Sequence, residues 1–192
     1  MRGRGARMTH PKILDRTTTA LVVVDIQEAF RSAIPDFTVV ASRASTAVRG
    51  FQILGVPVLV TEQYPKGLGK TAEEIQLVLN DDCQTFEKTA FSSCGAGEFV
   101  TYLEQLKARQ VVLCGLETHV CVNQTAHDLL DRGFDVHLLT DAVCSRFEHD
   151  TQAGLAKMRA SGVVPSSIEM ALFELMKDSK HAEFKEIQNL IK

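Results

Sequence analysis

Two polar side chains follow aliphatic runs at points where they could take part in catalysis. Asp25 comes directly after the run at residues 20–24, so its carboxylate lies at the rim of a core, where desolvation raises the pKa of a carboxyl group. Cys121 follows a second run at residues 111–113 and falls in the first turn of a predicted helix. The free N–H groups and the dipole at that end of a helix stabilise a thiolate and can donate to an oxyanion. Cys121 is therefore a candidate nucleophile and Asp25 a candidate functional carboxylate.

Lys88 is the third candidate, because it lies between Phe86 and Phe91 and its amine could point into the protein. Each of the three residues, taken alone, also fits an ordinary structural role. Asp25 fits a turn or a helix cap, Lys88 a solvated surface residue, and Cys121 a small buried hydrophobic residue.

The elements that must position these residues follow from the hydrophobic pattern. Short runs rich in β-branched residues alternate with longer segments of helical periodicity, which is typical of a parallel sheet with helices on both faces. We expect strands at residues 20–24, 56–61, 111–113, 136–139 and 163–164. We expect helices at residues 37–54, 71–79, 97–108, 120–132, 147–161, 167–176 and 181–191. The pattern predicts a three-layer α/β/α fold with a mostly parallel sheet of five or six strands and a site at their carboxyl ends.

Length, charge and cysteine content narrow the class of protein. The 192 residues suit a flexible tail over residues 1–17 and a single domain over residues 18–192. A formal net charge of -3 argues against nucleic acid or an anionic membrane as the main partner. The five cysteines, an odd number without C-x-x-C spacing, indicate free thiols in a reducing compartment. We expect a cytoplasmic location, with a mitochondrial one as the alternative because the first ten residues carry arginines and no acidic residue.

The segments around the three candidate residues together resemble a known family. Residues 22–27 (VVVDIQ), 87–92 (EKTAFS) and 115–122 (GLETHVCV), in this order and spacing, resemble the isochorismatase-like cysteine hydrolases. The resemblance runs from about residue 18 to residue 176, and the segment TEQYP at 61–65 resembles the isochorismatase domain-containing branch.

The resemblance implies that Asp25, Lys88 and Cys121 form a catalytic triad. It also implies a non-proline cis peptide bond between Leu116 and Glu117, which would aim the backbone N–H groups of Glu117 and Cys121 as an oxyanion hole. In such a site Asp25 accepts the thiol proton, Cys121 attacks a carbonyl carbon and water hydrolyses the thioester. Lys88 and the helix N-terminus favour the thiolate, whereas the Asp25 carboxylate opposes a second anion, so Asp25 and Cys121 should titrate as a coupled pair. We expect Lys88 to decide the balance and Cys121 to ionise more readily than the other four thiols.

Four further residues, Phe30, Tyr64, Phe91 and Thr118, are candidates for lining a substrate pocket. The nicotinamidase-type relatives place an aspartate and two histidines after the second strand to hold a divalent metal, whereas residues 61–65 contain no histidine. We therefore expect neither a metal nor a cofactor. True isochorismatases generally lack the cysteine, so Cys121 also argues against isochorismate as the substrate.

These features predict a metal-independent cysteine hydrolase of an amide or related C–N bond in a small molecule, and the family implies a homodimer or homotetramer. One alternative is a binding or scaffolding protein that keeps the hydrolase fold but turns over little substrate. A second alternative is a thiol-based redox sensor, for which only Cys114 is close to Cys121 in sequence.

Overall fold

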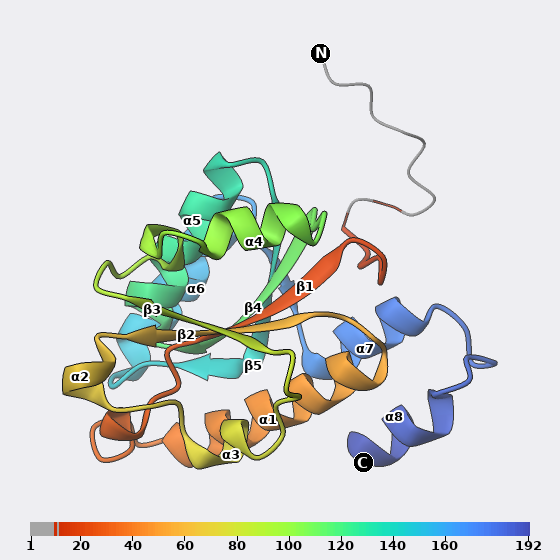
Figure 1. Ribbon diagram of the computed structural model, residues 1–192, viewed down its shortest axis with the longest axis horizontal. Coiled ribbons are helices and arrows are strands. Elements are labelled where there is room, and N and C mark those ends of the chain that lie inside the picture. The colour runs from red at the N-terminus through yellow and green to blue at the C-terminus, as the bar shows by residue number, and fades with distance from the viewer. Residues whose placement is uncertain (1–9, 11) are drawn as a thin grey trace.

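The computed structural model describes residues 10 and 12–192, and its centre is a parallel sheet of six strands (Figure 1). The strands are β1 (Thr19–Val24), β2 (Val58–Gln63), β3 (Gln84–Lys88), β4 (Gln110–Leu116), β5 (Asp135–Cys144) and β6 (Val164–Ser166). Their order across the sheet is β3-β2-β1-β4-β5-β6, and every neighbouring pair is parallel. The α/β/α fold expected from the sequence is confirmed.

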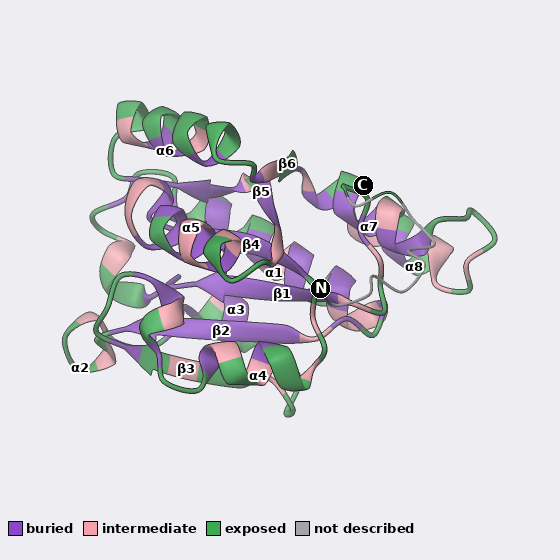
Figure 2. Cartoon of the chain, turned by 90° about the horizontal axis from the view of Figure 1, so that it is seen from above, coloured by how far each residue is buried: buried purple, intermediate pink, exposed green. Residues whose placement is uncertain are grey.

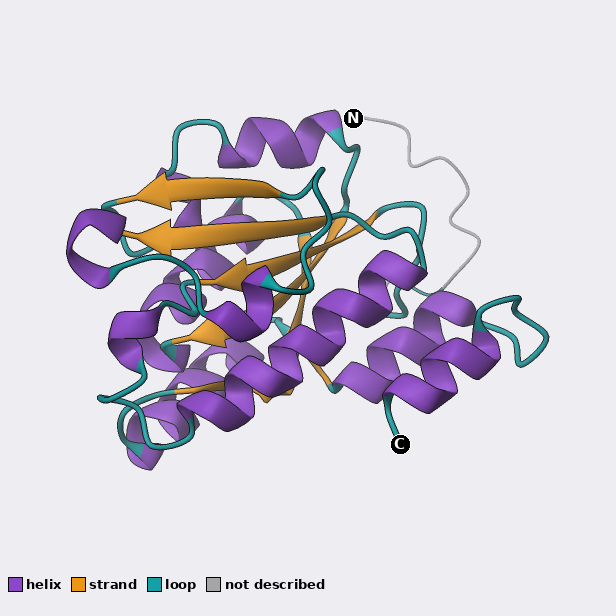
Figure 3. Ribbon diagram, turned by 60° about the horizontal axis from the view of Figure 1, so that its bottom comes forward, coloured by secondary structure: helices purple, strands orange, loops and turns teal. Residues whose placement is uncertain are grey.

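Helices cover both faces of the sheet. They are α1 (Phe37–Ile53), α2 (Pro65–Leu68), α3 (Glu73–Gln76), α4 (Phe99–Gln105), α5 (Asn123–Asp131), α6 (Glu148–Ala160), α7 (Ile168–Met176) and α8 (Phe184–Leu190). Helices α4, α5 and α6 lie on one face, while α1, α3, α7 and α8 lie on the other (Figures 1 and 3). Within the described residues no helix combines the length and the apolar character needed to cross a membrane.

The central strands are buried on both sides, as Figure 2 shows in purple. In β1, Leu21 and Val23 join the hydrophobic cluster beneath α1, whereas Val22 and Val24 join the cluster beneath α4 and α5. Neighbouring side chains of a strand point to opposite faces, so an uninterrupted aliphatic run can fill both clusters at once. This is why the aliphatic run at residues 20–24 forms the middle of the sheet.

Strand β3 is absent from the elements that the periodicity predicts. It pairs with β2 alone, so it forms an edge of the sheet. Gln84, Thr85 and Glu87 are exposed, Phe86 is half-buried and only Lys88 is buried. An edge strand needs fewer apolar residues than a central one. Because most positions of β3 are polar, the strand contains no aliphatic run from which it could be predicted.

The expected flexible tail does not reach residue 17. Leu14 is fully buried, its backbone N–H donates to Glu174 Oε2 at 3.0 Å, and the Ile13 carbonyl accepts from Gln110 Nε2 at 2.9 Å. Residues 13 and 14 are thus held against the domain, because the Leu14 side chain fills the core and the backbone bonds Glu174 and Gln110. The rest of the expected tail, residues 1–9 and 11, lies outside the described residues.

Gly115 allows β4 to approach the end of β1 unusually closely. Its φ is +124°, and a Cβ atom at this position would lie 2.0 Å from the Val24 carbonyl oxygen. The pairing of β4 with β5 shifts register between Leu113 and Gly115, so the strand bends at this point. Val24 directly precedes Asp25. The lack of a side chain at Gly115 therefore lets the carboxyl ends of β1 and β4 lie close together.

We expect Gly115→Ala to destabilise the fold far more than Gly133→Ala. Both glycines have positive φ, but a Cβ on Gly133 would meet nothing within 4 Å. Gly133→Ala should lower the free energy of unfolding by about 1–2 kcal/mol, which is the strain of a left-handed alanine. Gly115→Ala adds a backbone clash and should exceed about 4 kcal/mol or prevent folding. Urea unfolding followed by circular dichroism measures both, and equal losses would contradict the close approach.

Candidate active site

The Asp25 carboxylate is fixed at the end of β1 and is inaccessible to solvent. The residue has φ +51°, and this left-handed turn directs the chain out of the strand. Its Oδ1 accepts a hydrogen bond from Thr61 Oγ1 at 2.8 Å, and its Oδ2 lies 2.6 Å from Lys88 Nζ. Two neighbouring strands, β2 and β3, thus supply a hydroxyl and an ammonium group to one carboxylate.

Lys88 directs its ammonium group inward from the edge strand, and its side chain is fully buried. Besides Asp25, the Nζ atom donates to Gln63 Oε1 at 2.8 Å and to the Phe91 carbonyl at 2.9 Å, with the Ala90 carbonyl at 3.3 Å. An ammonium has three protons, so these acceptors use all of its donor capacity. The geometry fixes the Lys88 Nζ atom between a carboxylate, a side-chain amide and two backbone carbonyls.

Cys121 completes a buried chain of three ionisable groups. Its side chain is 6% exposed, and the Asp25 carboxylate is near enough for its charge to act on the pKa of the thiol. Burial, followed by the charge of Asp25, raises the pKa of Cys121 to about 12, and the Lys88 charge opposes this only in part. The structure therefore brings Asp25, Lys88 and Cys121 together, with the thiol protonated at rest.

The pKa values of the thiols do not support the expectation that Cys121 ionises most readily, which stays a prediction. Burial raises the pKa values of Cys83 and Cys94 to about 11, below the value for Cys121. The sequence argument weighed Asp25 against Lys88 and the helix terminus and expected Lys88 to decide, whereas burial of the sulfur, followed by the charge of Asp25, has the larger effect on the pKa of Cys121.

A π-helical turn, Thr118–Val122, carries the nucleophile instead of the first turn of an α-helix. Gly154 of α6 packs against this turn, where a Cβ atom would lie 3.0 Å from His119 Cα. Before the turn, Glu117 Oε1 accepts from both the backbone N–H and the Nε atom of Arg146, each at 3.0 Å. Turns of the π type are often found at functional sites, and this one is held from two sides.

The expected cis peptide bond between Leu116 and Glu117 is wrong, because the described chain contains no cis bond. A cis bond before a residue other than proline costs about 3–4 kcal/mol. Here Gly115 makes the change of direction, and the Glu117 carbonyl accepts from the N–H groups of Val120 and Val122 at 3.0 and 3.3 Å. The oxyanion-hole role of the Glu117 and Cys121 N–H groups stays a prediction.

A buried row of hydroxyl groups connects Asp25 to the helix that follows Cys121. Ser93 Oγ lies 3.4 Å from Thr61 Oγ1, and Thr125 Oγ1 of α5 lies 3.1 Å from Ser93 Oγ. Thr125 Oγ1 also accepts from the Ser93 backbone N–H at 2.8 Å. Single threonines and serines carry no recognisable spacing, so sequence reasoning missed this row.

Gln27 and Gln63 form a second support that the sequence did not reveal. Gln27 Oε1 accepts from the Gln63 N–H at 2.7 Å, and Gln27 Nε2 donates to the Gln63 carbonyl at 3.0 Å and to the Gly69 carbonyl at 2.7 Å. The Gln63 amide then bonds Lys88 and the Thr89 carbonyl. Gln27 is the last residue of the motif at 22–27, so its place in that motif was the one feature of the sequence that could have indicated this role.

The four candidate pocket residues have different environments. Thr118 is fully buried, and its Oγ1 has no hydrogen-bond partner among the described residues. Tyr64 and Phe91, which follow β2 and β3, are each 53% exposed, while Phe30 is half-buried against the cluster beneath α1. Their shared role in lining a pocket stays a prediction.

The segment after β2 uses its polar side chains within the protein. Glu62 is buried, and its Oε1 accepts from the N–H and the hydroxyl of Thr71 at 2.7 and 2.8 Å. Its Oε2 lies 3.2 Å from Lys70 Nζ. Among residues 10 and 12–192, no three His, Cys, Asp or Glu side chains are grouped as metal ligands would be.

The redox alternative requires Cys114 and Cys121 to meet. Cys114 belongs to the cluster beneath α1, and Cys121 belongs to the cluster on the opposite face of the sheet. Both are free thiols. A disulfide needs Cα atoms within about 7 Å and Cβ atoms that face one another, which this arrangement opposes.

We expect Asp25→Asn to increase alkylation of Cys121 and Lys88→Met to decrease it. Asp25 raises the pKa of the thiol and Lys88 lowers it, so the two variants should shift its pH profile in opposite directions. At pH 9, iodoacetamide should modify Cys121 about tenfold faster in Asp25→Asn than in the unmodified chain.

Cys83 and Cys94 serve as internal controls, because their labelling should not change between these variants. Peptide mapping by mass spectrometry gives all the rates in one digest. Unchanged labelling of Cys121 in both variants would show that its thiol does not respond to the Asp25–Lys88 pair.

Comparison with known proteins gives the family. The isochorismatase domain model matches residues 19–170. The chain is 43% identical over 175 residues to isochorismatase domain-containing protein 1 of Salmo salar, covering 91% of this chain and 61% of that protein, so it spans about three fifths of that relative's length. It is 40% identical over 173 residues to isochorismatase domain-containing protein 2 of Danio rerio, covering 90% of this chain and 86% of that protein.

The structure of MAR1 ribonuclease from Caenorhabditis elegans superposes with a TM-score of 0.88 and 38% identity, covering 93% of this chain and 92% of that chain. With an isochorismatase-like hydrolase fold and these relatives, the chain belongs to the isochorismatase family.

Proposed function

We propose that this protein is a metal-independent cysteine hydrolase that cleaves an amide or related C–N bond in a small molecule. The observation that carries the proposal is the buried cluster formed by the Cys121 thiol, the Asp25 carboxylate and the Lys88 ammonium group. A thiol with a carboxylate nearby has both a nucleophile and a proton acceptor, which acyl transfer requires.

In the first step, Asp25 accepts the thiol proton as Cys121 Sγ forms a bond to the carbonyl carbon. The carbonyl electron pair moves to oxygen, and the N–H groups of Glu117 and Cys121 stabilise the resulting oxyanion. The oxyanion then collapses, the C–N bond breaks, and Asp25 returns its proton to the leaving nitrogen. The products of this half-reaction are a free amine or ammonia and a thioester on Cys121.

Water resolves the thioester with Asp25 acting again as base. Asp25 accepts a proton from water as the water oxygen bonds to the carbonyl carbon. The C–S bond then breaks, and the sulfur regains its proton from Asp25. The carboxylic acid leaves and the resting thiol is restored, so each turnover consumes one water molecule and no other reactant.

Lys88 acts in this scheme as a fixed charge and transfers no proton. All its donor capacity is used by Asp25, Gln63 and backbone carbonyls. Its positive charge lowers the energy of whichever neighbouring group is anionic, the carboxylate at rest or the sulfur during attack.

The C. elegans relative is called a ribonuclease, but two observations favour amide hydrolysis for this chain. A net charge of -3 gives little general attraction for a polyanion. The thiol also lies near the carboxylate, an arrangement suited to acyl transfer, whereas ribonucleases act on phosphodiesters. The other alternative, a binding protein with the hydrolase fold, predicts no turnover.

A panel of small amides and ureido acids should contain a substrate that the unmodified chain hydrolyses and Cys121→Ser does not. Loss of the thiol should reduce kcat by at least about a thousandfold, because the triad acts as a unit. Rapid-quench intact-mass spectrometry should show a transient acyl adduct on Cys121. Activity should survive exhaustive chelation, because Glu62 and Gln63 already bond protein groups where related enzymes hold a metal.

Three results would contradict this proposal: an equally active Cys121→Ser variant, activity that requires one divalent ion, or cleavage of an RNA oligonucleotide in place of every amide. Static light scattering on the same preparation tests the expected homo-oligomer, and a strict monomer would contradict that expectation. Cys94→Ser is the matched control, since it removes a thiol away from Asp25.

Thr61→Val should lower kcat about tenfold while changing KM by less than about twofold, since Thr61 holds Asp25 Oδ1 and contacts the proton acceptor. Thr61→Ser keeps the hydroxyl and should retain nearly full activity. Steady-state kinetics of the three proteins, with urea unfolding to confirm that each is folded, provides the test. A Thr61→Ser variant as impaired as Thr61→Val would show that the methyl group, not the hydroxyl, is what matters.

A further inference from the structure

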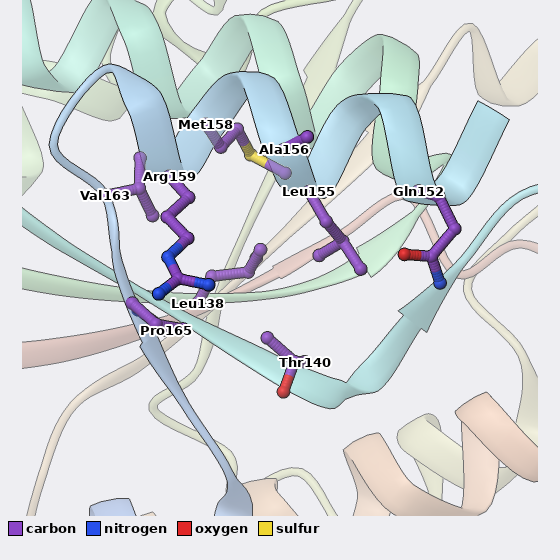
Figure 4. Close-up of a pocket in the computed structure, with 9 residues that line it drawn as sticks. All are labelled: Leu138, Thr140, Gln152, Leu155, Ala156, Met158, Arg159, Val163 and Pro165. Carbon is purple, nitrogen blue, oxygen red and sulfur yellow. The ribbon is translucent and has the colours of Figure 1, made fainter. Parts of the chain in front are cut away.

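A cavity lies away from the Asp25, Lys88 and Cys121 cluster, between α6 and the β5–β6 edge of the sheet (Figure 4). Its volume is about 310 Å³, which is at the lower end of the range for small-molecule sites. None of its lining residues belongs to the Asp25, Lys88 and Cys121 cluster. It therefore has no part in the proposed hydrolysis.

The walls of the cavity are mainly apolar. Six side chains supply this surface, namely those of Leu138, Leu155, Ala156, Met158, Val163 and Pro165. The contribution of α6 is centred on residues 152, 155, 156 and 159, a spacing that places them along one stripe of the helix. Gly154, which packs against the nucleophile turn, lies on another face of α6.

Three polar side chains border the cavity, and two of them are already bonded. Thr140 Oγ1 donates to the Ser166 carbonyl at 3.0 Å, and Gln152 Nε2 donates to Glu148 Oε1 at 2.6 Å. Arg159 differs, because its guanidinium forms no ion pair or hydrogen bond with any residue that the structure describes. Figure 4 shows it extending from α6 toward Pro165 and Leu138, along the cavity wall.

An unpaired guanidinium beside an apolar wall has a definite chemical preference. It offers parallel N–H donors that match a carboxylate, and the neighbouring aliphatic surface favours a hydrocarbon chain or ring. No carboxylate of the described residues lines the cavity, so an incoming anion meets no like charge among the lining groups.

We propose that this cavity binds a small organic monocarboxylate, with its apolar body against Leu155, Met158 and Val163 and its carboxylate on Arg159. Octanoate is the probe that fits this description, since it has one carboxylate and a flexible apolar chain. Octan-1-ol has the same chain without the charge and measures the apolar contribution alone.

Methyl-resolved NMR of the full chain, labelled at Ile, Leu, Val and Met, tests the site directly. Octanoate should shift the methyl signals of Leu138, Leu155, Met158 and Val163, while signals beside the catalytic cluster, such as that of Val122, should not move. Octan-1-ol should shift the same signals with at least about fivefold weaker affinity, because it lacks the charge-assisted bonds. The measurement requires no turnover, so it does not depend on the proposed function.

Two variants of α6 separate the role of the guanidinium from general charge. Arg159→Gln should weaken octanoate about fivefold or more and leave octan-1-ol unchanged. Lys157→Gln removes the same charge from an exposed position of α6 outside the cavity lining and should leave both affinities unchanged. Ala156→Phe fills the cavity from an exposed helical position and should abolish both binding events.

Several results would overturn the proposal. These are the absence of methyl shifts at millimolar octanoate, shifts confined to the catalytic cluster, and equal octanoate affinity in Arg159→Gln and Lys157→Gln. Concentration-dependent shifts of the same methyl groups without ligand, accompanied by faster sedimentation, would show that a second copy of the chain covers the cavity instead.

Discussion

Two opposite charges that are completely removed from water cost several kcal/mol each in lost hydration, and their mutual attraction offsets this only when nearby polar groups satisfy both ions. The Asp25–Lys88 pair meets that condition through Thr61 on one side and through Gln63 and the Phe91 carbonyl on the other. These acceptors and donors come from β2 and from the segment after β3. The buried ion pair is therefore stable only while β2, β3 and that segment stay in their present positions.

Cys121 depends on the same pair in a different way. A carboxylate alone would keep the thiol neutral through the whole reaction, because it disfavours a second anion beside it. An ammonium alone would give a thiolate with no acceptor for its proton. The ion pair holds the proton on sulfur at rest and leaves a nearby base to receive it. The raised pKa of Cys121 is consistent with a nucleophile that ionises only as it attacks.

The sheet was largely predictable from the sequence because its central strands are long aliphatic runs that bury both faces. Strand β3 was not, since Gln84, Thr85 and Glu87 suit its exposed edge. The three candidate residues could be selected because their types and motifs are unusual. The π turn around Cys121 and the trans bond at Leu116 could not be foreseen, since both follow from tertiary packing. Gly115 against Val24 and Gly154 against His119 set the path of the backbone there.

The most exposed strand of the sheet thus carries one of its most deeply buried charges. Amide groups at a sheet edge exchange with solvent through local openings that require much less free energy than global unfolding. Opening of β3 would withdraw Lys88 from Asp25 while β1, β4 and the helices stay folded. The working state of the site is therefore less stable than the protein that contains it. Resistance of the whole chain to heat or denaturant reports the stability of the core strands. The lifetime of the assembled Asp25–Lys88 pair instead depends on how often the edge strand β3 opens.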